Sequence, residues 1–228
     1  MRVIQVPPSP HGTRYVTGLA ADAKGHVYLC RGGEILVYGT ASGDLQRTIT
    51  AKTAHLDFTD VAVDANGTLY AVHASASDDA VVSFNAAGGV AHRWDHPVSA
   101  TSSYDALTLN LGVDGLGQMF FASHSGNQVY RLDSAGRLVD RFGSEGDQPG
   151  QLDAPAAIAV DGQGRVLVQE FLGRVDVFDG TGRFLSRLDP QYTKGAPMGM
   201  TLDRQGNLYQ VTNEGKVLKY RLTGLPTP

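Results

Sequence analysis

A short turn pattern recurs five times along the chain and constrains its fold more than any single residue does. In each copy an Asp is followed three residues later by a Gly, and the copies lie at Asp22–Gly25, Asp64–Gly67, Asp114–Gly117, Asp161–Gly164 and Asp203–Gly206. Successive Asp residues are 42, 50, 47 and 42 positions apart, a period typical of repeated structural units. An Asp that accepts backbone N–H groups, followed by a Gly that tolerates positive φ, favours the tight turn of an antiparallel hairpin.

Each repeat also carries strand-like runs in a constant register around this turn. A second strand follows the turn and places a large apolar side chain at the same offset in every unit: Tyr28, Tyr70, Phe120, Leu167 and Tyr209. A third strand ends at Tyr38, Phe84, Leu132, Phe178 and Tyr220. Alternation of apolar and polar residues, as in 174–178, indicates strands with one buried face.

A second turn and a fourth strand complete the first four repeats. The second turns are Thr40–Gly43, Asn85–Gly88, Asp133–Gly136 and Asp179–Gly182, and the fourth strands place Ile49, Trp94, Phe142 and Leu188 in one repeated apolar position. Trp94 is therefore interpreted as a packing residue, with ligand contact as the alternative. The fifth repeat stops after its third strand.

Four short antiparallel strands per unit, repeated radially, are typical of β-propeller blades. The sequence thus predicts an all-β fold, a β-propeller of five four-stranded antiparallel blades that forms a single domain over residues 1–228. The missing outer strand of the last blade is assigned to Arg2–Val6, which we expect to pair with Val217–Tyr220 and to cover an exposed sheet edge. A sixth blade would require a partner.

The chain length and composition suit this prediction. A chain of 228 residues buries about 70% of its unfolded surface on folding, so it needs neither a disulfide nor a metal for stability. Cys30 is the only cysteine and is expected to be a buried thiol in a protein of a reducing, cytoplasmic compartment, although a removed signal peptide would leave no trace. The N-terminus lacks the apolar core of a secretory signal, and no apolar run has the 18 residues of a spanning helix.

The fourth repeat resembles a known family. The stretch from Phe142 to Pro155, with Ile158–Asp161 and Arg174–Phe178 after it, strongly resembles an NHL repeat, and the other units resemble it more loosely. The resemblance covers nearly the whole chain and implies a propeller, usually one of six blades. NHL propellers include RNA-binding and protein-binding modules, and related propellers act as lactonases or as an amidating lyase. The fold alone therefore leaves the function open.

In propellers of this kind, the loops between second and third strands and the connections between blades converge on one face. The residue that begins each second-to-third loop is usually Asp in NHL repeats, but here it differs in every blade. We predict a binding face over these loops, with neutral drift of exposed loops as the alternative. Its predicted residues are Arg31, His73, Asp78, Asp79, Tyr104, His124, Glu170, Phe171, Tyr192 and Asn213.

A metal site is a second hypothesis. The starts of the innermost strands hold Asp60 and Asn110, and Glu170 is expected nearby. Because Ca²⁺ takes six to eight oxygen ligands, these three side chains could supply part of a calcium site, as the likeness to gluconolactonase-type propellers implies. The alternative is hydrogen-bonded lining of the propeller axis. The seven histidines show no zinc-type spacing, and no nucleophile motif is present.

Charge discriminates among the possible partners. The predicted face contains Arg31, Lys52 and Lys194, against a larger acidic set of Asp57, Asp78, Asp79, Asp105, Glu145, Asp147, Asp153, Glu170 and Glu214. Phosphate-binding surfaces carry the opposite charge, so nucleic acid is disfavoured. The sequence therefore favours a non-catalytic scaffold, without cofactor, for a cationic protein or peptide. The alternatives are a metal-assisted hydrolase or lactonase, which would require Ca²⁺, and an RNA-binding module.

Overall fold

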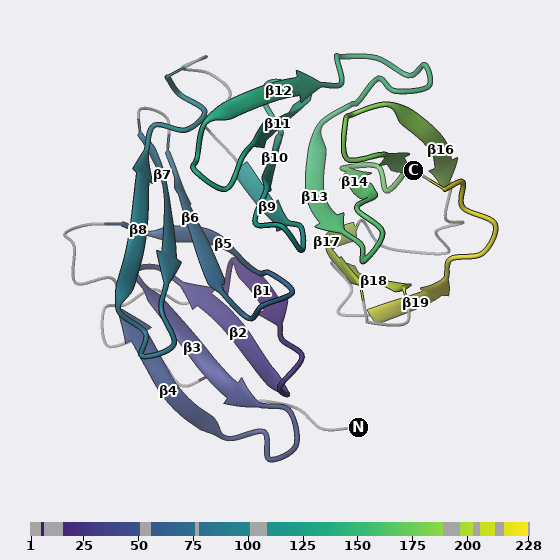
Figure 1. Ribbon diagram of the computed structural model, residues 1–228. Helices are drawn as coiled ribbons and strands as arrows, with labels where there is room; N and C mark the ends of the chain where they lie inside the picture. The colour runs from purple at the N-terminus through teal and green to yellow at the C-terminus, as the bar shows by residue number, and fades with distance from the viewer. Residues whose placement is uncertain are drawn as a thin grey trace.

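Five antiparallel sheets follow one another along the chain in the computed structural model, which describes residues 6, 16–50, 56–75, 78–100, 109–188, 197–202, 206–212 and 217–227. They are arranged as the blades of a β-propeller (Figure 1). In each sheet the strands pair in chain order, so that every blade is an up-and-down meander. No helix that could span a membrane occurs in these ranges.

The strands lie where the repeats place them. Blade 1 contains β1 (Gly18–Ala21), β2 (His26–Arg31), β3 (Glu34–Gly39) and β4 (Leu45–Thr50). Blade 2 contains β5 (Phe58–Val63), β6 (Leu69–Ala74), β7 (Asp79–Phe84) and β8 (Val90–Asp95). Blade 3 contains β9 (Leu109–Val113), β10 (Met119–Ser123), β11 (Gln128–Leu132) and β12 (Leu138–Phe142). Blade 4 contains β13 (Pro155–Val160), β14 (Val166–Glu170), β15 (Val175–Phe178) and β16 (Phe184–Leu188). Blade 5 contains β17 (Pro197–Leu202), β18 (Asn207–Thr212) and β19 (Val217–Arg221).

The predicted fold class is confirmed: the protein is an all-β, five-bladed propeller. The first strand of each blade is the innermost, and the series β1, β5, β9, β13 and β17 lies side by side in that order. Blades 1 to 4 have four strands, and blade 5 has three within the described ranges.

The repeated turns form as the Asp and Gly positions predict. In the first turn, Oδ1 of Asp22 accepts the backbone N–H groups of Lys24 and His26, at 2.8 and 2.9 Å. The same two backbone N–H groups, two and four residues further on, donate to the side chains of Asp64, Asp114 and Asp161 in the next three blades. In the second turns they donate in the same way to Asn85, Asp133 and Asp179. The glycines that follow have φ between 77° and 88° in these turns, a backbone region that favours glycine.

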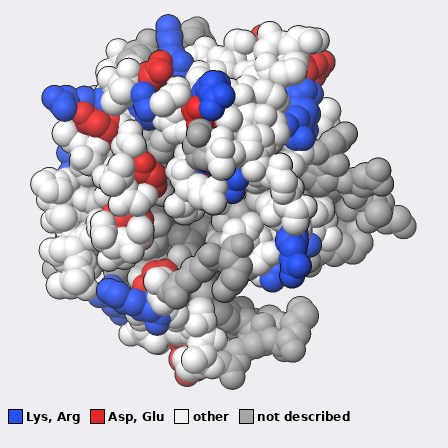
Figure 2. Space-filling view, turned by 45° about the vertical axis from the view of Figure 1, so that its right-hand side comes forward, with Lys and Arg blue, Asp and Glu red and all other residues white. Residues whose placement is uncertain are grey.

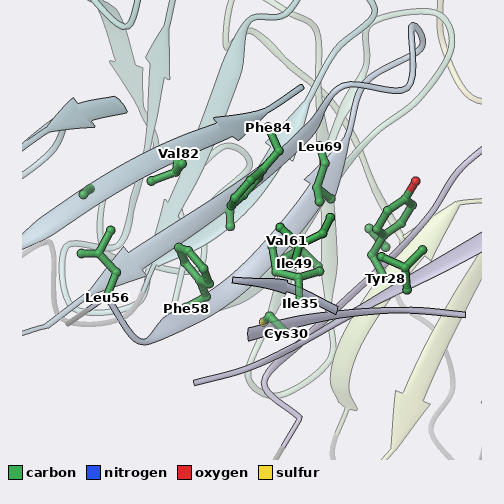
Figure 3. Packing of buried hydrophobic residues seen from close by; sticks show 14 residues of the cluster. Tyr28, Cys30, Ile35, Ile49, Leu56, Phe58, Val61, Leu69, Val82 and Phe84 are labelled. Carbon is green, nitrogen blue, oxygen red and sulfur yellow. The ribbon is translucent and has the colours of Figure 1, made fainter. Parts of the chain in front are cut away.

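The core lies between blades rather than within one sheet. Figure 3 shows the first interface, where Tyr28 and Ile35 of blade 1 pack with Phe58, Leu69 and Phe84 of blade 2. Equivalent apolar clusters join blade 2 to 3, 3 to 4, and 4 to 5. In blades 1 to 4 the second and third strands are largely buried, for example over β3, β7 and β14, because neighbouring segments cover the sheets.

The fourth strands of blades 1, 2 and 3 reach across to the next blade. Ile49 of β4 belongs to the cluster that contains Leu69 and Phe84 of blade 2. Trp94 of β8 packs in the same way onto blade 3, and Phe142 of β12 onto blade 4. These positions are the repeated apolar position of the sequence, so the interpretation of Trp94 as a packing residue agrees with its place in the structure.

The junction between blades 5 and 1 differs from the others. Leu19 of β1 is 52% exposed, whereas Val61 and Leu111, at the same position in the next two blades, are 3% exposed. Val6, however, packs against Leu36 and other residues on the face of blade 1 that points away from blade 2. That position matches the packing of Ile49 on blade 2. The remaining residues of the predicted closing strand, 2–5, lie outside the described ranges.

Candidate functional site

The loops predicted to converge do meet at one end of the propeller. The N–H group of Phe58, which begins blade 2, donates to the carbonyl of Gly32 in the β2–β3 loop at 2.8 Å. The N–H group of Phe171 in the β14–β15 loop donates to the carbonyl of Ala154 at 3.0 Å. We call this end the loop face; its described parts are residues 31–34, 74–75, 78–79, 96–100, 123–127, 143–154 and 170–174.

Three of the predicted binding residues, Arg31, Asp79 and Glu170, are buried within the loop face. Arg31 is 4% exposed, and its guanidinium lies 3.0 Å from the carboxylate of Glu34. Asp79 is fully buried, and its carboxylate accepts the backbone N–H groups of Val98 and Ser99 at 2.8 and 3.1 Å. Asp79 therefore holds the turn at 96–100, and Arg31 and Asp79 both have structural partners.

His73 and Asp78 lie together at the end of blade 2, beside His96. Nδ1 of His73 is 2.8 Å from the carbonyl oxygen of Asp57. A carbonyl only accepts, so this nitrogen carries the proton. The carboxylate of Asp78 is 3.9 Å from Nε2 of His73 and 3.5 Å from Nδ1 of His96. His96 belongs to the turn that Asp79 caps, and the repeat pattern does not predict this turn.

His124 and Phe171 come together across the junction of blades 3 and 4. Their rings meet edge to face, with centroids 6.4 Å apart. Phe171 is 51% exposed and the adjacent Leu172 is 77% exposed. Leu172 is not among the binding residues predicted from the sequence. An aliphatic residue inside a four-residue hairpin turn is the signal that would have identified it.

A charged network fixes the loop at 143–154 beside this pair. The guanidinium of Arg187 forms two hydrogen bonds with the fully buried carboxylate of Asp176, at 2.6 and 2.8 Å. It also donates to the carbonyls of Asp147, Gln148 and Gln151, at 2.6, 3.1 and 3.4 Å. Arg187 thus supplies hydrogen bonds and a compensating charge to the buried carboxylate, and it also holds the backbone of the loop in place.

Glu170 lies beneath the same loop and is 2% exposed. One of its oxygens is 2.6 Å from Arg174, and Arg174 in turn is 3.1 Å from Asp147. Burial raises the pKa of Glu170, while the hydrogen bond and charge of Arg174 lower it. Its other oxygen is buried without a hydrogen-bond partner in the described ranges. Glu170 is thus part of the scaffold under the loop face.

Asp60, the centre of the metal hypothesis, connects three blades. Its carboxylate accepts the N–H groups of Val61 and of Leu111 in blade 3, at 2.8 and 3.0 Å. Gly18 of blade 1 lies so close that a Cβ there would be 2.5 Å from Oδ1 of Asp60. Burial raises the pKa of Asp60 to about 7, although the two N–H donors lower it.

The structure does not bring the predicted calcium ligands together as an obvious cage. Asn110 follows Leu109 on the next innermost strand and is partly buried, and Glu170 is paired with Arg174. Within the described residues, no group of three or more His, Cys, Asp or Glu side chains has a geometry that could hold a metal ion. The metal site remains a prediction that metal analysis can test.

Tyr104, Tyr192 and Asn213 lie outside the described ranges. Burial raises the pKa of Cys30 to about 12, which makes its thiol a poor nucleophile at neutral pH. In the view of Figure 2, Lys and Arg side chains are interspersed with Asp and Glu side chains over the visible surface.

Comparison with known proteins identifies the fold only. No family model and no curated protein match the chain. Among solved structures, virginiamycin B lyase from Staphylococcus aureus is 13% identical, with a TM-score of 0.59 over 91% of this chain and 70% of the lyase chain. A chain of a mitotic checkpoint complex is 10% identical, with a TM-score of 0.60 over 86% and 56%. A Bacteroides caccae protein of unknown function is 13% identical, with a TM-score of 0.63 over 93% and 84%.

Proposed function

We propose that this propeller is a non-catalytic binding scaffold whose loop face holds a protein or peptide carrying positive charge. The observation that carries the proposal is the exposure of Phe171 and Leu172, 51% and 77%, at the tip of one hairpin turn of that face. Contiguous exposed apolar side chains rimmed by polar residues are typical of interaction sites. The propeller fold is consistent with this role, since repeat propellers present their loops as a rigid platform.

The charge of the loop face supports a cationic partner. Asp147 has 81% of its side chain exposed, and Glu145 and Asp153 are exposed in the same loop. Arg31, by contrast, is buried against Glu34. Acidic groups around an apolar contact steer cationic partners and make their association sensitive to salt.

We also propose that the chain is a divergent propeller of the NHL type. The supporting observation is the structure of the stretch that carries the resemblance: Leu152 is fully buried, and Arg187 holds three carbonyls of the loop around it. The RNA-binding and metal-dependent lactonase functions of related propellers are less favoured, because the exposed charge of the described loop face is mainly acidic and Asp60 accepts two backbone N–H groups.

The test uses a photo-crosslinking amino acid placed at one exposed leucine at a time. Leu172 on the loop face and Leu116 in the Asp114–Gly117 turn are 77% and 80% exposed. They form a matched pair, because their exposure is similar and their turns lie at opposite ends of the propeller. In a lysate of the native source, we expect protein adducts at position 172 that decrease at high salt, and few at position 116. Equal adducts at both positions, or none at 172, would contradict the proposal. Stoichiometric Ca²⁺ in purified protein, lost in Asp60→Asn, would favour the hydrolase instead.

A further inference from the structure

The most exposed apolar side chains of the described loop face belong to one rigid turn. Gly173 donates its N–H group to the carbonyl of Glu170 at 2.8 Å, and Phe171 donates to Ala154 at 3.0 Å. The Phe171 ring is supported on one side by His124. A side chain presented in a fixed conformation loses little conformational entropy when a ligand covers it. The turn backbone and Phe171 are therefore restrained, and Leu172 is 77% exposed in the same turn.

Two acidic side chains flank this turn. Asp153 directly precedes Ala154, the residue hydrogen-bonded to Phe171, and it is exposed. Asp147 is 3.1 Å from Arg174, which lies two residues beyond Leu172. Arg174 is 20% exposed and turned toward the buried Glu170, so the outward charge at this position is that of the 81% exposed Asp147.

The backbone of the loop that carries Asp147 and Asp153 is held by side chains of the neighbouring blades. Arg187 donates to three carbonyls of loop 143–154, including that of Asp147 itself at 2.6 Å. Asn127, in the same turn as His124, accepts the N–H group of Ala154 through its side chain at 2.8 Å. The loop is thus tied to blade 3 by Asn127 and to blade 4 by Arg187. An apolar patch and its negative flanks form one preorganised unit at the junction.

We propose that this unit, the patch of His124, Phe171 and Leu172 between Asp147 and Asp153, is the anchoring site for a peptide segment of a partner protein. The segment carries one large apolar side chain next to a Lys or Arg. The apolar side chain covers Leu172 and the exposed half of Phe171, while the neighbouring cation pairs with either acidic flank. The proposal rests on the proposed function of the loop face and assigns its specificity to blades 3 and 4.

A displayed library of random heptapeptides tests the site with a defined probe. The library is selected against the wild-type protein and, separately, against Phe171→Ser with Leu172→Ser. Selected peptides are then synthesised, and their affinity is measured by fluorescence anisotropy at about 50 and about 300 mM NaCl. Leu116→Ser is the matched control. It removes a similarly exposed leucine from the β9–β10 turn of blade 3, at the end of the propeller opposite the loop face. Thermal melts establish that each variant is folded.

We expect wild-type selection to enrich peptides with an aromatic or aliphatic residue within two positions of Lys or Arg. Their affinity should fall at least about tenfold in the double variant and remain unchanged in Leu116→Ser. Asp147→Asn and Asp153→Asn should each weaken binding about two- to threefold and reduce its salt dependence.

Other outcomes separate this proposal from the broader one. Peptides that bind the double variant as tightly as wild type, but lose affinity in His73→Ala, would place the binding site on blade 2 and overturn this assignment while the loop face keeps its function. Salt-independent binding of peptides without Lys or Arg would contradict the proposed role of Asp147 and Asp153 in binding a cation. Failure to select any peptide on the wild-type protein would overturn both proposals.

Discussion

The indole ring of Trp94 on β8 lies directly on Gly136, in the second turn of the next blade. Its Nε1 donates to the carbonyl of Ala135 at 2.9 Å, and a Cβ at position 136 would overlap the indole Cδ1. The same relationship recurs on either side: a Cβ at Gly88 would be 3.2 Å from Ile49, and one at Gly182 would be 2.5 Å from Phe142. In each of these blades, an apolar side chain of the fourth strand packs against a glycine in the second turn of the next blade.

We therefore expect Gly136→Ala to be far more destabilising than a conformationally matched change. Gly136 and Gly164 both have φ of 77°, but nothing lies within 4 Å of a Cβ at Gly164. Gly164→Ala should cost about 1 kcal/mol for the backbone conformation alone. Gly136→Ala should cost about 3 kcal/mol, because the clash with Trp94 is added. Urea unfolding of both variants measures the difference, and equal losses would contradict the packing of Trp94 on this glycine.

Arg187 should stabilise the fold mainly by pairing with the buried carboxylate of Asp176. In Arg187→Met, the fully buried Asp176 loses both side-chain hydrogen bonds. Leaving a buried charge without its partner costs about 3 to 5 kcal/mol. The double variant Arg187→Met with Asp176→Leu should recover a large part of that loss. A double variant as unstable as Arg187→Met would show that the contacts to loop 143–154, rather than Asp176, dominate.

Asp60 should make stability depend on pH in the neutral range. The pKa of Asp60 in the folded protein is about 7, above the value of about 3.9 in an unfolded chain. The folded state thus holds an extra proton between these values, so the contribution of Asp60 is most favourable below about pH 4 and is lost as pH rises through 7.

The measurement is the free energy of unfolding of wild type and Asp60→Asn from pH 5 to 8. The difference between them should change by up to about 1.4 kcal/mol per pH unit in favour of the variant as pH rises, since Asn does not titrate. Parallel curves would show that Asp60 is already ionised at pH 5. In Asp60→Asn, the N–H group of either Val61 or Leu111 loses its carboxylate acceptor. We therefore expect the variant to be less stable than the wild type at pH 5.

Removal of residues 1–6 should destabilise blade 1. Val6 covers the face that contains Leu36, and the deletion exposes that face together with the already exposed Leu19. We expect a loss of a few kcal/mol and a tendency to associate through the uncovered sheet. Val6→Ala, which keeps the backbone, should lose about 1 kcal/mol. Unchanged thermal stability of the deletion would contradict closure of the propeller by this segment.

Much of the fold could be predicted because it depends on local chemistry that repeats. An Asp with a Gly three residues later makes the same hydrogen-bonded turn at Asp22 and Asp161, and alternating residues define the faces of each strand. Five copies in constant register leave few alternatives to a radial array of blades. The repeated apolar position of the fourth strand likewise predicts Trp94 as a packing residue, and its partner is the Ala135–Gly136 turn of blade 3.

The sequence by itself thus determined the strands, the turns and the propeller. Only the tertiary structure decided which loop residues remain available to a ligand, since that depends on contacts between segments far apart in the chain. Asp79 caps the turn at 96–100, Arg31 pairs with Glu34, and Asp60 binds the backbone of the next blade, so none presents a free charge to the loop face. Leu172 remains exposed because its turn is held from below and nothing in the described ranges covers its tip. Burial and hydrogen bonding of a side chain are properties of the assembled blades, and repeat register does not encode them.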